Sequence, residues 1–195
     1  MGRPYRLITI TNHGANMKNI LIAALFVALS FASGAVFSAW DKDESKEYDE
    51  KAQVALTQLL AKNPSVQDMI DQSVGFVVIP TVGKVGFGIG GARGKGVLYE
   101  GKAVTAVVTL TQLSFGFQWG GQAYSEFLFF QNKLALDSFK QGNYELGAQA
   151  SAVAITAGVS IDAEFVNGMA ILTVAKGGLM YEASVGGQKF KVKLK

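Results

Sequence analysis

A glycine-rich stretch with three basic residues lies between residues 83 and 96, where the sequence reads GKVGFGIGGARGKG. Gly86, Gly88 and Gly91 fit the spacing G-x-G-x-x-G, which holds a pyrophosphate in dinucleotide-binding proteins. That site needs a helix directly after the third glycine, because the helix N-terminus binds the phosphates. Here the stretch runs on into strand-like Val97-Leu-Tyr. The sequence therefore argues against a nucleotide site.

The basic residues of this stretch remain candidates for binding another anion. Exposed backbone N–H groups and nearby cations suit a phosphate group. A second basic strip lies at the C-terminus, where lysines alternate with Phe190, Val192 and Leu194. The predicted anion-binding residues of the two strips are Lys84, Arg93, Lys95, Lys189, Lys191 and Lys193.

Each strip also has a structural interpretation. The glycines suit a strand that faces bulky neighbours such as Phe115 and Trp119. Arg93 could be an exposed turn residue paired with Glu100. The C-terminal lysines could keep an edge strand soluble. The sequence leaves these alternatives open.

Composition excludes most catalytic and metal chemistry. The chain has no cysteine, and its one histidine is His13. Ser-His-Asp and Cys-His mechanisms and zinc-thiolate sites are therefore absent from the expected mature chain. Asp162 and Glu164 are the only close carboxylate pair on one side of a strand-like segment, and they flank a turn at Asn167-Gly168. We expect a non-enzymatic protein without cofactor, catalytic residue or metal site.

Residues 17–39 have the three regions of a secretory signal peptide. A short basic start, an apolar run from Ile20 to Phe31 and a series of small residues predict cleavage between about Ala35 and Ala39. An uncleaved membrane anchor is the alternative. Residues 1–16 are interpreted as an upstream extension from a start codon placed too early, and 40–195 as one domain. We expect a periplasmic or secreted protein.

The charge balance argues against nucleic acid as a partner. Three of the 18 basic residues precede Asp41, so residues 41–195 contain 15 basic and 15 acidic residues. That part of the chain is neutral, whereas nucleic-acid binding needs a strong basic field.

The hydrophobic pattern predicts two N-terminal helices, at 45–61 and 64–72, and a short internal helix at 133–139 capped by Asn132. The expected strands are Val74–Ile79, Val85–Ala92, Gly96–Tyr99, Ala103–Thr111, Leu113–Gly120, Ser125–Phe130, Tyr144–Thr156, Met169–Ala175, Leu179–Val185 and Lys189–Leu194. Glu100-Gly-Lys is a predicted hairpin turn. The fold class is α+β, with a curved, mostly antiparallel β-sheet or barrel-like core.

Several motifs resemble the SYLF domain family, also known as the Las-seventeen-binding actin-regulator family. The resemblance covers about Val54 to Val192. It is carried by the Pro80…Gly86-x-Gly-x-Gly-Gly…Gly94-x-Gly96 run, the Ser114-x-Gly-x-Gln-x-Gly120 strand, the apolar–Asn132…Phe139…Gly142 segment, the Leu146-Gly-Ala148 strand and the Lys176-Gly-Gly-Leu179 turn.

The family resemblance implies binding to acidic phospholipids, assisted by an amphipathic N-terminal helix, with actin binding in fungal members. Because export is expected here, actin is not an expected partner. The leading hypothesis is an exported protein that associates with anionic phospholipid at the bacterial envelope. The alternative is a periplasmic carrier that encloses an apolar ligand.

Overall fold

Two long paired strands form the centre of the computed structural model, which describes residues 42–142, 144–147, 152–155, 163–177 and 185–195, with backbone alone for 42, 86–89, 114–120 and 177. β1 (Gly75–Glu100) and β2 (Ala103–Phe130) are antiparallel along their whole length. Gly101, with φ of 61°, makes the predicted turn between them, because glycine adopts positive φ without steric cost. Contacts group Trp40–Lys195 into one compact unit.

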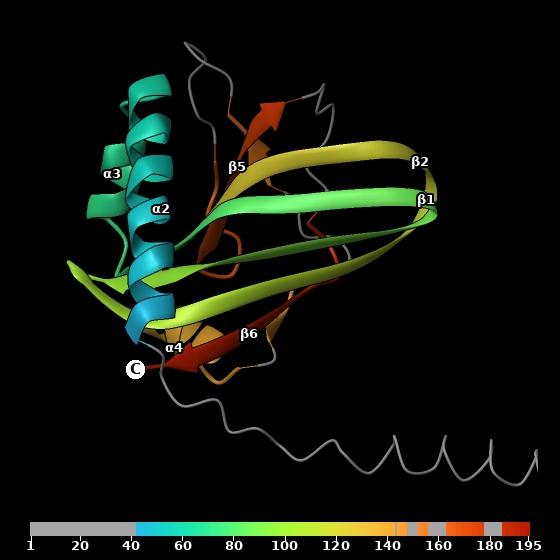
Figure 1. Cartoon of the computed structure of the whole chain (residues 1–195). Coiled ribbons are helices and arrows are strands. Elements are labelled where there is room, and N and C mark those ends of the chain that lie inside the picture. The colour runs from blue at the N-terminus through green and yellow to red at the C-terminus, as the bar shows by residue number, and fades with distance from the viewer. Residues whose placement is uncertain (1–41, 143, 148–151, 156–162, 178–184) are drawn as a thin grey trace, which may run out of the picture. The chain divides into compact units, whose positions relative to one another are not determined.

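The paired strands curl back on themselves. Figure 1 shows β1 and β2 running together away from the helices, bending, and returning. We call 75–83 with 123–130 the first leg, and 91–100 with 103–113 the second leg. Register shifts between Ile79 and Val82 and between Phe87 and Ile89 accompany the curvature, as β-bulges do in strongly bent sheets.

Shorter strands extend the sheet from both legs of β2. β6 (Gln188–Leu194) pairs with the second leg and β3 (Tyr144–Glu145) with β6, both antiparallel. β5 (Met169–Gly177) pairs antiparallel with the first leg, and β4 (Val153–Ala154) lies parallel to β5. The predicted curved, mostly antiparallel sheet is confirmed.

Two glycines allow the legs of β1 to approach each other closely. A Cβ atom added at Gly96 would lie 2.0 Å from the carbonyl oxygen of Val78, and one at Gly94 would lie 2.7 Å from a methyl carbon of Ile79. Real Cβ atoms do not approach other heavy atoms so closely. At these two positions the glycine-rich stretch therefore serves backbone packing.

Helices cover both faces of the sheet. α2 (Lys42–Lys62) and α3 (Val66–Asp71) pack their buried residues against one face, in a cluster with Phe127, Phe129 and Val97. The Tyr99 hydroxyl donates to Asp49 of α2. α4 (Lys133–Lys140) packs against the other face through Leu136 and Phe139. The Asn132 side chain accepts from the Ala135 N–H, which confirms the predicted cap. No helix in the described ranges is both long and apolar enough to span a bilayer.

Seven of the ten predicted strands need correction. The three ranges expected between 74 and 99 form one strand, and so do the three between 103 and 130, because the pairing of β1 with β2 resumes after each register shift at which the ribbon is irregular. The range Tyr144–Thr156 is not one strand, because its two ends pair with β6 and β5 at opposite edges of the sheet. Of the range Leu179–Val185 only Val185 is among the described residues, and the predicted signal segment at 17–39 lies wholly outside them.

We predict that Gly96→Ala lowers the free energy of unfolding by about 3 kcal/mol, because the added methyl group overlaps the Val78 backbone. Urea unfolding followed by circular dichroism measures the change. Gly83→Ala is the matched control, since a Cβ atom there meets no heavy atom within 4 Å. We expect it to change stability by less than about 0.5 kcal/mol. Equal stabilities for the two variants would contradict the close approach of the legs.

Candidate anion-binding face

The sheet register joins the two basic strips, which are far apart in the sequence. Arg93 of β1 pairs with Thr111 of β2, and Thr111 pairs with Lys189 of β6. In the next row of this face, Thr109 stands between Lys95 and Lys191. Directly paired residues project to the same side of a sheet, and two strand spacings span about 10 Å. We call Arg93, Lys95, Lys189 and Lys191 the basic face.

The remaining two predicted residues take different positions. Lys193 is half-buried. It follows Lys191 by two residues on the same side of β6 and pairs with Val107 of β2. Lys84 lies two residues after Val82, which packs in the core cluster with Ala92. Side chains alternate along a strand, so Lys84 projects to the same side of the sheet as Val82 and Ala92. Arg93 directly follows Ala92 and therefore projects to the opposite side. The structure therefore separates Lys84 from the basic face.

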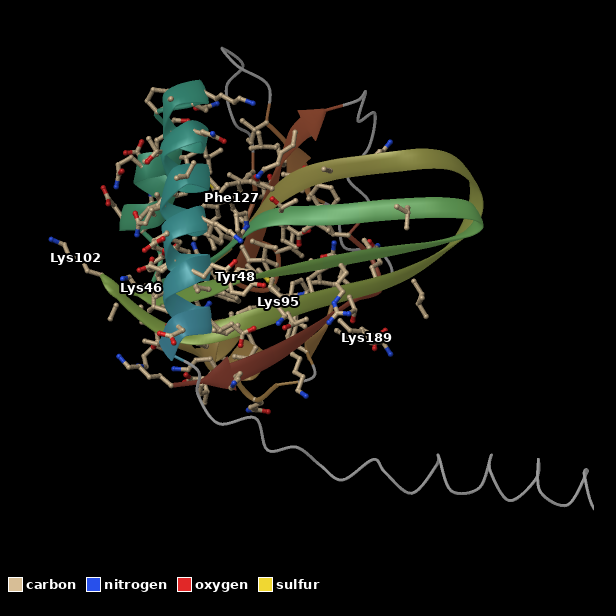
Figure 2. All side chains as sticks on the ribbon, viewed as in Figure 1. Lys46, Tyr48, Lys95, Lys102, Phe127 and Lys189 are labelled. Carbon is tan, nitrogen blue, oxygen red and sulfur yellow. The ribbon has the colours of Figure 1, made fainter. Side chains whose placement is uncertain are left out.

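Carboxylates partner some of these cations. Lys95 Nζ lies 2.6 Å from Glu44 Oε1 of α2, a contact that raises the pKa of Lys95, and 5.8 Å from the centre of the Tyr48 ring. Lys189 Nζ lies 3.3 Å from Glu145 Oε2. Figure 2 shows Tyr48 and Lys95 where α2 meets the sheet, with Lys189 toward β6.

Arg93 is exposed, and no ion pair joins it to another of the described side chains. The alternative pairing of Arg93 with Glu100 is wrong, because Glu100 Oε1 accepts instead from Lys140 Nζ at 2.7 Å and from the Thr105 hydroxyl at 2.8 Å. The guanidinium group is therefore accessible to an anion from solution.

Two open hollows flank Arg93, and its side chain lines both. One has a volume of about 500 Å³ and lies beside α2, and its lining includes the polar side chains of Lys51, Thr81 and Lys95. We call it the polar hollow. The other, of about 570 Å³, lies toward the bend of the ribbon and reaches Lys189. We call it the apolar hollow, since Val85 and Leu113 line it.

Val85 and Leu113 expose 68% and 76% of their surface. These fractions are far above those of the core residues and place two large apolar groups in water. Gly83 and Gly91 contribute backbone without side chains to the same hollow. Apolar and cationic groups therefore meet at Arg93.

A buried carboxyl group, which is not among the residues predicted from the sequence, lies on the opposite side of the sheet. Glu126 has no exposed surface, and its Oε2 accepts from Gln188 Nε2 at 3.0 Å. Gln188 Nε2 also lies 3.4 Å from the Tyr124 hydroxyl. Because Gln188 belongs to β6 beside the second leg, this bond links the two legs. Glu126 Oε1 and Gln188 Oε1 have no hydrogen-bond partner among the described atoms. The only signal in the sequence was a single charged residue directly before the apolar run Phe127–Phe130.

Burial raises the pKa of Glu126 to about 8. The folded state therefore keeps a proton that the unfolded chain, with its ordinary carboxyl pKa of 4.5, releases. This contribution to stability is fully present below about pH 4.5 and is lost as pH rises toward about 8.

The carboxylate pair considered for catalysis is only partly visible. Asp162 lies outside the described residues, and Glu164 is exposed to solvent. The neighbouring turn is confirmed by φ angles of 53° at Asn167 and 77° at Gly168. Within the described ranges no cluster of three or more acidic or histidine side chains could hold a metal ion.

We predict that Glu126→Gln flattens the pH dependence of stability between pH 5 and pH 8. One retained proton gives a slope of at most about 1.4 kcal/mol per pH unit, and glutamine removes it while keeping the shape of the side chain. Urea midpoints at several pH values measure the slope. The exposed change Glu164→Gln should keep the wild-type slope. Parallel profiles for wild type and Glu126→Gln would contradict a carboxyl that is protonated in the folded state.

Comparison with known proteins gives a family match and a relative. Residues 111–194 match the family model Ysc84, Las17-binding protein actin regulator. Beta cell expansion factor A of Aeromonas veronii is 26% identical over 142 residues, which are 71% of this chain and 53% of the relative. The chain thus spans about half the length of that protein. The matched range includes Lys189 and Lys191 and begins after Arg93. The resemblance to the Ysc84, or SYLF, family is confirmed over residues 111–194, the range that the family model matches.

Proposed function

We propose that this protein binds anionic phospholipid at a membrane surface, catalyses no reaction, and contacts the lipid with the basic face. The observation that carries the proposal is the register that sets Arg93 and Lys95 beside Lys189 and Lys191. Membership of the SYLF family fits lipid binding in general. The choice of lipid and of contact residues comes from the charges on this face.

The strength of the attraction follows from local charge. A basic residue at an anionic membrane surface contributes about 1 kcal/mol, and the contribution falls off within a Debye length of about 10 Å. Residues 41–195 are neutral overall, so the attraction comes from the uneven placement of their charges. Glu44 and Glu145 reduce it, because they partner Lys95 and Lys189.

A carrier function is the second candidate, and the packing of the core disfavours it. A carrier would enclose its ligand between the concave side of the sheet and α4. That space holds Leu128, Phe130, Phe139 and Phe190, which are fully buried and belong to one cluster. The aromatic rings of Phe139 and Phe190 lie 5.4 Å apart. This close packing supports a ligand at the surface.

We predict that Arg93→Gln, Lys95→Gln, Lys189→Gln and Lys191→Gln together weaken binding to phosphatidylglycerol-containing vesicles by at least ~10-fold at low salt, because four surface charges are lost. The salt dependence of binding should flatten as well. Vesicle flotation at increasing sodium chloride measures both effects.

A charge-matched control changes four other exposed lysines: Lys46, Lys62, Lys102 and Lys133. Figure 2 shows Lys46 and Lys102 on the other side of α2 from Lys95 and Lys189 in that view. Glu44→Gln releases Lys95 and should strengthen binding. Equal losses of vesicle binding in the two quadruple variants would contradict a localised basic face. If the wild-type protein floated with neutral vesicles but not with anionic ones, the proposed function itself would be contradicted.

We also propose that the protein is exported to the periplasm or beyond, as the signal-peptide pattern of 17–39 predicts. Expression of the full chain in a Gram-negative host should yield a mature protein whose N-terminus lies between residues 36 and 40. Intact-mass measurement of the periplasmic fraction locates the cleavage. A full-length protein found only in the cytoplasm would contradict export. Because export separates the protein from actin, we propose no actin partner.

A further inference from the structure

We propose that the two hollows hold one phospholipid molecule, with its phosphate at Arg93, its headgroup in the polar hollow and the start of its acyl chains in the apolar hollow. The inference rests on the proposed function and adds the position, orientation and headgroup class of the lipid. Its starting observation is that Arg93 lines both hollows.

Arg93 suits the phosphate position for geometric reasons. Its guanidinium group can donate two parallel hydrogen bonds to a phosphate, which a lysine cannot do. Lys95 follows two residues later on the same side of β1, and Lys189 lies across Thr111 on β6. Lys189 shares only an exposed ion pair with Glu145. Exposed pairs of this kind are weak, so a phosphate can compete for the lysine.

The polar hollow favours an anionic headgroup that carries hydroxyl groups. Lys51, Arg93 and Lys95 line it, and Lys176 Nζ donates to the hydroxyl of Thr81 at 2.9 Å. Two carboxylates, Glu44 and Glu47, pair with two of these four cations. The remaining positive charge repels the ammonium of choline or ethanolamine headgroups. Glycerol hydroxyls instead find the phenol of Tyr48 and the hydroxyl of Thr81 nearby.

The apolar hollow provides room and contact surface for acyl chains. Val85 and Leu113 present exposed side chains there, and covering them removes apolar surface from water. Gly83 and Gly91 leave space between these side chains. A Cβ atom at Gly83 meets nothing within 4 Å, and one at Gly91 meets only the Gln112 carbonyl oxygen at 3.5 Å. A side chain introduced at Gly83 would therefore enter the hollow without displacing the core.

The test uses a short-chain lipid that is soluble as a monomer. Dihexanoyl phosphatidylglycerol is titrated below its micellar concentration into the ¹⁵N-labelled protein. Glycerol 3-phosphate, inorganic phosphate and dihexanoyl phosphatidylcholine serve as comparison ligands. We expect dihexanoyl phosphatidylglycerol to bind at least ~10-fold more tightly than glycerol 3-phosphate or inorganic phosphate, since two buried methylene groups alone give about tenfold. It should also bind more tightly than dihexanoyl phosphatidylcholine, which has the same acyl chains, because the cations of the polar hollow repel the choline ammonium. Amide shifts should gather around Arg93, Gly83 and Thr81.

Two variants test the apolar hollow. Gly83→Phe fills it, and Leu113→Asn removes apolar surface at a position too exposed to affect folding. Each should reduce phosphatidylglycerol binding by at least ~5-fold and leave glycerol 3-phosphate binding unchanged. Ala103→Phe, at the exposed end of the hairpin, is the control and should bind like wild type. Arg93→Lys should weaken both ligands, because it loses the bidentate contact.

The outcomes separate this inference from the proposed function. Wild-type binding of the short-chain lipid by both Gly83→Phe and Leu113→Asn would overturn the inference, and vesicle binding through the basic face could still stand. Equal affinity for phosphatidylglycerol and glycerol 3-phosphate would also overturn it, since the site would then be a simple phosphate site. Failure of the wild type to bind anionic vesicles would instead overturn the proposed function.

Discussion

The close approach of the two legs of β1 is the constraint on which the rest of the structure depends. It requires that Gly94 and Gly96 have no side chain, because their Cβ atoms would overlap the backbone and side chains of residues 78–82. Once the legs lie together, the β1–β2 ribbon must bend at its far end (Figure 1). β5 then pairs with the first leg of β2, and β6 pairs with the second leg. One long hairpin thus becomes a curved sheet with two different faces.

The properties of each face follow from what covers it. α2 covers only part of one face of the sheet. Along this face of β1, Val97 and Tyr99 are buried, whereas Lys95 is half-buried and Arg93 is exposed. The basic face is therefore a continuation of a core-forming surface beyond the edge of the helix. The acidic first turn of α2 supplies Glu44 to Lys95 at this edge. The ion pair between Glu44 and Lys95 therefore both joins α2 to the sheet and lowers the net positive charge of the basic face.

The other face closes around a core that includes one ionisable group. Glu126 is fully buried, and its hydrogen bond with Gln188 spans the two legs. Burial without a charged partner favours the protonated carboxyl group, which explains the raised pKa. A polar link of this kind adds specificity to the arrangement of the legs, since an unpaired carboxyl group in the core would be costly.

The sequence by itself determined the local elements: the helices, the Asn132 cap, the Gly101 turn, the alternation within each strand, the two basic strips and the resemblance to the SYLF family. These depend on residues close together in the chain. Only the tertiary structure decided that Arg93 and Lys95 lie beside Lys189 and Lys191, that Lys84 faces away, and that Glu126 is buried. The alternation of side chains along a strand assigns each residue to one of the two sides of that strand. The register between β1, β2 and β6 assigns it to neighbours about a hundred residues away, and that register follows from the bend and the close approach of the legs.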